Sequence, residues 1–461
     1  MKGDFTRDTF DATRHFSRVL MQQGRVQLDA DWNEQAAILL HYLQALAADL
    51  IGPHGGPANP DGTKGDGFAI VAKTGSNKDF VIKPGHYYVD GILCENYLVD
   101  KDGKPLEVTY TGQTDYPLTK EAMLEVGKSY LVYLDVWERH LTYVEVEDVQ
   151  GSVISIREVA LSGPDTATRA QVVWQVKVIN TLPDQKTPIP PGKEPVLAAW
   201  PGWVTNWQPG NRGLLKARAI KPESADAENP CITPPESRYR GAENQLYRVE
   251  IHKGGTAAEV ATFKWSRENG SVIFPIVGVE DKGYLVTGLG CDPRSCLEPG
   301  DWVEFVNDDI TLQNIANPLL KVDSIDPDTN TVKFPVLPSV PDKAKHPFLR
   351  RWDQKDTDNY TPNENGVTIV EGDNYIELED GVQIQFQPGA KYRTGDYWLI
   401  PARTATGDVE WPGPKNAPEP KEPDGITHHY APLWIILVDA AGAVTADPNR
   451  DCRRQFKPVL V

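Results

Sequence analysis

The sequence predicts a mainly β, multi-domain protein built from small β-barrels or sandwiches, with one N-terminal amphipathic helix. Three observations lead to this prediction. The chain has 461 residues, and a single hydrophobic core stops growing well before that length, so about two to four domains are expected. Gly and Pro number 38 each, which suits many short strands joined by tight turns. Apolar residues follow a helical spacing over one long stretch only, whereas strand-like alternation recurs along the rest of the chain.

The helical signal lies between Asp31 and Gly52. Asp31 and Glu34 have the spacing of a capping box, and Gly52 before Pro53 is expected to end the helix. One face is apolar and comprises Leu39, Tyr42, Leu43, Leu46 and Leu50. Such an apolar face is expected to be covered by another protein surface. Two candidates stay open, the helix's own domain and a neighbouring subunit.

Residues 66–182 carry the first group of strand patterns, in which β-branched and aromatic residues alternate between Gly, Pro and Asp. The predicted strands are 80–82, 87–93, 130–137, 141–146 and 172–179, and 141–146 is expected to pair with 130–137. Residues 183–245 then form a Pro- and Trp-rich connector. Five prolines within 181–195 favour an extended, semi-rigid segment, and the rest of the connector shows no clear periodicity.

Two further β regions follow the connector. The first, 246–345, holds predicted strands 246–251, 261–265, 271–277, 302–305, 322–325 and 331–334, with an Asn269-Gly270 hairpin turn after the second of them. The second, 346–461, holds predicted strands 375–378, 382–386, 397–400 and 433–438. A Pro-rich excursion at 411–425 interrupts it and is a candidate partner-binding arm. With 1–65 as an N-terminal arm and helix that serve assembly, these segments make up the predicted domain organisation.

The charge balance excludes some partners. Lys and Arg total 47 and Asp and Glu total 65, a formal net charge of −18. Such an acidic surface repels nucleic-acid phosphates and anionic membranes. We find no apolar run long enough to span a bilayer and no signal-peptide core at the polar start. Synthesis in the cytoplasm is therefore expected, and the odd number of cysteines, five, suits reduced thiols.

Several patterns invite a chemical interpretation, and each has a simpler one. Glycines at 52–56 lack a preceding strand and are not expected to bind phosphate. His428 and His429 are adjacent, but neighbouring strand residues point to opposite faces, which disfavours a shared metal. Cys291 and Cys296, with Cys231 as a distant third thiol, form one Cys pair where zinc sites usually have two, and a disulfide or free thiols stay open.

Two Asp-rich loops offer oxygen ligands for calcium, but turn chemistry explains both. They comprise Asp326, Asp328 and Asn330 in one loop and Asp353, Asp356, Asp358 and Asn359 in the other. Ser266, Arg267 and Glu268 are the strongest catalytic candidates, yet no histidine is near and Asn269-Gly270 marks a turn. The many Trp and Tyr residues could include a sugar-stacking platform, although most aromatics in β domains are core or interface residues. We therefore predict no catalytic residue, no cofactor and no metal site.

Three segments resemble one known family, and 392–398 is similar to it as well. The three are 14–35, 163–169 followed by 174–176, and 263–272, of which the first, RHFSRVLMQQGRVQLDADWNEQ, is the most specific. They are similar to an uncharacterised family encoded beside baseplate genes of contractile injection systems and related phage-tail-like particles. The resemblance implies an accessory structural component and transfers no catalytic motif.

The first of these segments also has a physical interpretation of its own. Its charges run from basic to acidic just before the predicted helix, which suits a register-setting interface. The predicted assembly residues are Arg14, Arg18, Arg25, Asp29, Asp31, Trp32 and Glu34. The alternative is that these charges pair within their own domain.

The function expected from the sequence is a structural, non-enzymatic part of a contractile injection system. The protein would lie at or around the baseplate as a cage, collar or extension, and would form a three- or six-fold homo-oligomer in contact with other tail proteins. Two alternatives stay open, a receptor- or glycan-binding fibre-like module and a particle-borne hydrolase.

Overall fold

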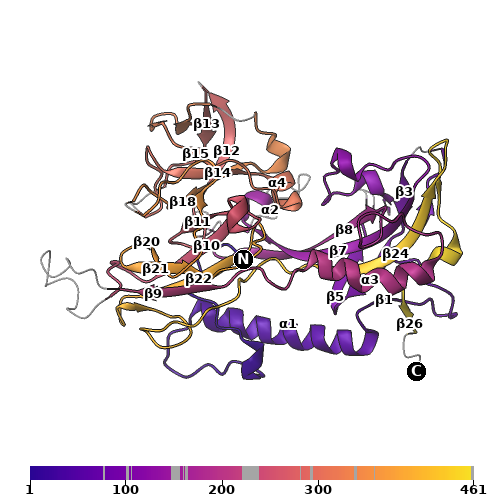
Figure 1. The fold of residues 1–461 in the computed structure, drawn as a ribbon, viewed down its shortest axis with the longest axis horizontal. Helices are drawn as coiled ribbons and strands as arrows, with labels where there is room; N and C mark the ends of the chain where they lie inside the picture. Colours follow the sequence, from indigo (N-terminus) through magenta and orange to yellow (C-terminus); the bar gives the residue numbers. More distant parts are fainter. Residues whose placement is uncertain are drawn as a thin grey trace, which may run out of the picture.

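The computed structural model of the chain describes residues 1–75, 78–99, 103–104, 106–146, 156–158, 160, 165–220, 238–280, 282–290, 294–336, 340–357 and 359–457. Strands account for 35% of it and helices for 16%, so the mainly β fold class with an N-terminal helix is confirmed. Figure 1 shows two β lobes side by side with the helix α1 lying beneath them. The helices are α1 (Asp29–Ile51), α2 (Tyr143–Val146), α3 (Lys193–Trp207) and α4 (Asp308–Gln313).

Three sheets build the first lobe. Their orders are β25-β24-β7-β8, β26-β1-β4-β5 and β2-β3-β6. The strands are β1 (His54–Pro57), β2 (Ile70–Ala72), β3 (Phe80–Ile82), β4 (Gly85–Val89), β5 (Ile92–Asn96), β6 (Val108–Thr109), β7 (Ser129–Leu141), β8 (Arg169–Ile179), β24 (His429–Val438), β25 (Val444–Thr445) and β26 (Gln455–Phe456).

Strand β7 organises this lobe because its two faces pack against different partners. Tyr130, Val132 and Leu134 point into the core shared with β2–β6, whereas Leu131, one residue along, packs under α3. This is the two-residue period of a strand buried on both faces. Strand β8 stays in unbroken register with β7 from end to end, and β24 pairs with its other edge.

The second lobe consists of a seven-stranded sheet, β15-β14-β18-β12-β13-β17-β16, above a five-stranded and a three-stranded one, β19-β11-β10-β22-β23 and β20-β21-β9. The strands are β9 (Leu215–Ala219), β10 (Gln245–Lys253), β11 (Thr262–Ser266), β12 (Ile273–Glu280), β13 (Gly283–Val286), β14 (Trp302–Val306), β15 (Leu320–Lys321), β16 (Ser324–Asp326), β17 (Thr331–Lys333), β18 (Phe348–Trp352), β19 (Val367–Thr368), β20 (Ile376–Glu379), β21 (Val382–Phe386), β22 (Tyr397–Arg403) and β23 (Asp408–Val409).

Five of the six sheets that the described residues form combine strands from more than one of the segments predicted as domains. Strand β24 near the C-terminus pairs with β7, β26 pairs with β1, and β9 from the predicted connector pairs with β21. The excursion 411–425 is held along the surface, because the backbone of Lys421 pairs with Leu215 and the Trp411 indole donates to the Glu419 carbonyl at 2.9 Å.

One prediction about the helices was wrong, and one helix was not predicted. Helix α1 begins at Asp29 rather than after Asp31, and Leu28 at its N-cap makes no side-chain capping bond. The predicted connector contains α3, whose Pro195 lies in the first turn, where proline is tolerated. Helix α3 packs on β7 and β24 through Val196 and Trp203.

Two predictions about strand connections were also wrong. Residues 143–146 form the short helix α2 instead of a strand, because Glu145 accepts from the Thr142 N–H at 2.8 Å and closes a helical turn. Asn269 and Gly270 do form a turn, with φ of 51° and 66°. The turn makes no hairpin, since β12 pairs with β13 and β18 rather than with β11.

Candidate functional site

The apolar stripe of α1 faces away from the body of the protein. The exposed fractions are 79% for Trp32, 55% for Leu39, 64% for Leu43, 57% for Leu46 and 76% for Leu50. Within α1 only Ala30 and Ile38 are buried. Of the two open candidates for covering this face, the helix's own domain does not cover it in the described structure.

The spacing of this stripe is that of a coiled-coil seam. Trp32, Ala36, Leu39, Leu43, Leu46 and Leu50 alternate by four and three residues. This mean period of 3.5 keeps the side chains in line along one face and matches a second helix laid beside it.

The opposite face of α1 is docked through polar and small groups. Gln35 accepts a hydrogen bond from the Val19 N–H at 2.8 Å, and Glu34 accepts from the Thr9 hydroxyl at 2.7 Å. At the β4–β5 turn, a Cβ on Gly91 would lie 2.1 Å from the carbonyl oxygen of Gln44. A close approach of two backbones therefore fixes which face of the helix is turned outward.

The N-terminal arm beside α1 is also exposed and apolar. The exposed large apolar side chains of residues 12–28 are Phe16, Leu20, Met21, Val26 and Leu28. Residues 12–28 contain Arg14, Arg18 and Arg25 and no carboxylate, whereas α1 contains four carboxylates and neither Lys nor Arg.

The predicted assembly charges do not pair with one another within the described chain. Arg14 lies 3.6 Å from Asp11, and neither Arg18 nor Arg25 has an ion pair there. Asp29 instead accepts from the Thr6 N–H at 2.8 Å. Asp31 is half-buried in the first turn of α1. Arg14, Asp29 and Glu34 thus have partners within the subunit, in line with the alternative, whereas Arg18 and Arg25 have no ion pair within the described chain.

A larger hollow, of about 480 Å³, lies where the two lobes meet the N-terminal residues, and buried charges line it. Arg248 contacts Glu250 at 2.6 Å, and Lys264 contacts Glu304 at 2.6 Å and Glu250 at 3.5 Å. Lys2 contacts Glu250 at 3.1 Å. Buried charges are tolerated when they pair in this way.

The electrostatics of this ionic cluster indicate a structural role. Burial alone would raise the pKa of Glu250, but Lys2, Arg248 and Lys264 hold it well below its usual range. Burial likewise opposes ionisation of Glu304, and Lys264 still lowers its pKa. Because both carboxylates stay ionised and paired, neither is poised to take a proton near neutral pH.

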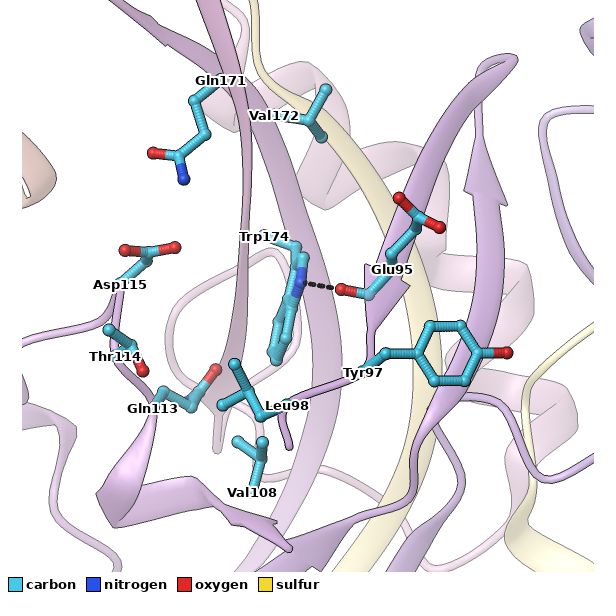
Figure 2. A pocket seen from close by; sticks show the side chains of 10 residues that line it. All are labelled: Glu95, Tyr97, Leu98, Val108, Gln113, Thr114, Asp115, Gln171, Val172 and Trp174. Carbon is cyan, nitrogen blue, oxygen red and sulfur yellow. Dashed lines mark hydrogen bonds between the residues drawn. The ribbon is translucent and has the colours of Figure 1, made fainter. Parts of the chain in front are cut away.

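A smaller hollow, of about 310 Å³, lies in the first lobe (Figure 2). Trp174 stands in its middle, and its indole donates to the Glu95 carbonyl at 2.8 Å. Gln113, Thr114 and Asp115 form the opposite side, and burial raises the pKa of Asp115. Two aromatic rings, Trp174 and Tyr97, with a few polar neighbours give this hollow little to distinguish one ligand from another.

The other sequence candidates have separate partners. His428 contacts Asp135 at 2.7 Å and His429 contacts Asp90 at 2.8 Å, so the adjacent histidines bind different carboxylates. Among the described residues, no group of three or more His, Cys, Asp or Glu is placed to hold a metal ion. Cys231 and Cys291 lie outside the described residues.

The catalytic candidates at the end of β11, Ser266, Arg267 and Glu268, do not form one site. Arg267 contacts Glu379 at 2.8 Å, whereas Glu268 pairs with Arg294 at 2.5 Å. The Ser266 hydroxyl accepts from the Glu268 N–H at 3.3 Å. Glu268 and Arg267 thus serve two different ion pairs.

The Asp-rich loops are explained by turns and ion pairs. Asp326 accepts from the Asp328 N–H at 3.1 Å inside the β16–β17 hairpin. Asp353 accepts from the Arg267 N–H at 2.9 Å. Asp356 lies 3.9 Å from Lys321, and Asp358 is outside the described residues. Part of the resemblance segment, 163–164, is outside them too.

Sequence comparison places the chain among known families. A family model described as "Family of unknown function (DUF6519)" matches residues 1–187 and 211–459. The chain belongs to this family. No curated protein and no solved structure matches it. The match to the family spans both lobes, α1 and the arm, and leaves out residues 188–210, which include all of α3. Within the described residues, no helix is both long and apolar enough to cross a membrane.

Proposed function

We propose that the protein is a structural subunit that assembles with further copies of itself through α1 and the N-terminal arm. The exposed heptad stripe from Trp32 to Leu50 is the observation that carries this proposal. Large contiguous apolar surfaces on soluble proteins mark interaction sites. Here the stripe has the period that a second helix or an extended apolar segment can follow.

The arm of a neighbouring copy fits this stripe in both chemistry and charge. Residues 12–28 carry three arginines and no carboxylate, and α1 carries four carboxylates and neither Lys nor Arg. The arm also presents Phe16, Leu20, Met21 and Val26 to solvent. An arm that lies on the helix of the next copy makes a head-to-tail contact, and such contacts form a ring when the rotation between copies closes.

We further propose that this ring belongs to a contractile injection particle and lies at or around its baseplate as a cage, collar or extension. The resemblance of segment 14–35 motivates that placement, and the same segment holds the exposed arm and the start of α1. A ring with three- or six-fold symmetry suits such a particle. Other baseplate and tail proteins are then the remaining partners.

Light scattering of the purified chain during size-exclusion chromatography tests the assembly. The expected mass is a multiple of 51.1 kDa that rises with protein concentration. A mass of one chain at every concentration would contradict self-assembly. The placement at the baseplate is tested by negative-stain microscopy, which compares particles from a deletion strain with those from the parent strain. Particles of unchanged shape and firing behaviour would rule out this placement.

A further inference from the structure

Aromatic side chains gather on the β7–β24 sheet at the C-terminal end of α3. Tyr133 and Trp207 stack with their centroids 4.5 Å apart and their planes 20° apart, and the Tyr430 ring lies 4.7 Å from Trp207. Trp137 and His428 continue the group at 5.7 Å. Together they bound a pocket of about 370 Å³, within the range that small-molecule sites occupy.

Strand geometry explains why these groups meet. Tyr133, Asp135 and Trp137 alternate along β7 and therefore share one face of the sheet. Lys177 on β8 is the register partner of Tyr133, and Tyr430 on β24 is the partner of Asp135. The C-terminal end of α3 then brings Trp207 over this face, so three separate parts of the chain build one aromatic floor.

The Asp135 carboxylate lies between the aromatic rings of this floor and is fixed by two hydrogen bonds. Asp135 accepts from Lys177 at 2.6 Å and from His428 at 2.7 Å. Burial alone would raise the pKa of Asp135, but Lys177 and His428 bring it below its usual value. An ionised carboxylate has about four lone-pair positions, and these two bonds use only part of them.

Several polar groups of the pocket have no partner within the described chain. The Trp137 indole N–H is buried, at 3% exposure of the residue, and makes no hydrogen bond there. The same holds for the hydroxyls of Tyr133 and Tyr430 and for the Trp207 indole N–H, which are half-buried at the pocket. An entirely apolar ligand would leave these groups unpaired at a cost in free energy.

We infer that this pocket binds a neutral saccharide unit. A sugar ring has an apolar face that can stack on Trp207 or Tyr430 and hydroxyls that can bond to Asp135 and the free N–H and O–H groups. The ionised Asp135 and the acidic chain disfavour a phosphorylated ligand. The pocket is separate from α1 and the arm, so saccharide binding and self-assembly can fail independently.

Tryptophan fluorescence of the full chain, titrated with glucose, galactose, mannose, rhamnose and N-acetylglucosamine, tests the site, together with a glycan array. At least one sugar should give a saturable change. Trp207→Ala should weaken its binding roughly tenfold or more, and Trp207→Phe should restore most of it, because a flat ring returns. Trp411→Ala, which removes a half-exposed tryptophan of the other lobe, is the matched control and should bind like the unaltered chain.

Tyr430→Ala is the second variant and is used if Trp207→Ala does not fold by circular dichroism. Loss of binding in either folded variant, with retention in the control, supports the saccharide site. The proposal is overturned if neither the sugars nor the array give binding above background. It is equally overturned if a glycan binds the unaltered chain and both pocket variants with the same affinity.

Discussion

Shortening two leucines of the α1 stripe should dissociate the assembly without harming the subunit. Leu43 and Leu46 occupy successive seam positions and are 64% and 57% exposed. Leu→Ala removes about three methylene equivalents, each worth about 0.8 kcal/mol when fully buried. If a partner covers the exposed fraction of each side chain, the binding free energy lost is about 1.5 kcal/mol for Leu43 and about 1.4 kcal/mol for Leu46. The double variant should therefore associate with a dissociation constant roughly 100-fold weaker.

Sedimentation velocity over a range of concentrations measures this effect. Alanine keeps a high helix propensity, so the thermal midpoint of the dissociated subunit should stay the same. Leu197→Ala is the matched control, because Leu197 is an exposed leucine on a different helix, α3. An unchanged dissociation constant in the double variant, or an equal loss in the control, would refute the assignment of the seam.

Three further predictions concern stability. Trp203 is 1% exposed in the core under α3, so Trp203→Ala leaves a cavity there and should lower the free energy of unfolding in urea by about 3–5 kcal/mol. A loss below about 1 kcal/mol would mean that α3 is not docked there. Glu250→Gln leaves Arg248 and Lys264 without their shared carboxylate and should cost about 3–5 kcal/mol by the same assay, and a neutral result would disprove the structural role of the ionic cluster. The hydrogen bond that the His346 ring donates to the Asp308 carboxylate raises the pKa of His346, so this pair stabilises the fold fully below about pH 6.5 and its contribution fades as the pH rises through the raised pKa. Thermal melts should show the unaltered chain losing its advantage over His346→Gln across that range, and parallel pH profiles of the two proteins would contradict the prediction.

Local patterns were enough to predict most individual strands. The alternations at 80–82, 172–179 and 382–386 became β3, β8 and β21, because a strand with one or both faces buried needs residues of that kind at every second position. The sequence also indicated the end of α1 at Gly52 and the apolar stripe that runs along it.

Helix α3 shows how a local signal can be hidden. Val196, Trp200, Trp203 and Trp207 follow a helical spacing, but the prolines before and within the segment favour an extended chain. Packing of Trp203 against β7 and β24 decides in favour of the helix, since tertiary burial outweighs local propensity. The ionic cluster likewise had a weak signal, because Arg248, Glu250 and Lys264 occupy strand positions beside apolar neighbours.

The sequence by itself determined the β class, the acidic character and the presence of an apolar helix face, because these depend on composition and on spacing within a few residues. The tertiary structure alone decided that this face turns outward, since the contact of Gln44 with the β4–β5 turn fixes the rotation of α1. It also decided that β24 lies beside β7 and that Trp207 reaches Tyr133. Strand order and helix rotation depend on contacts between residues tens to hundreds of positions apart, which no local pattern encodes.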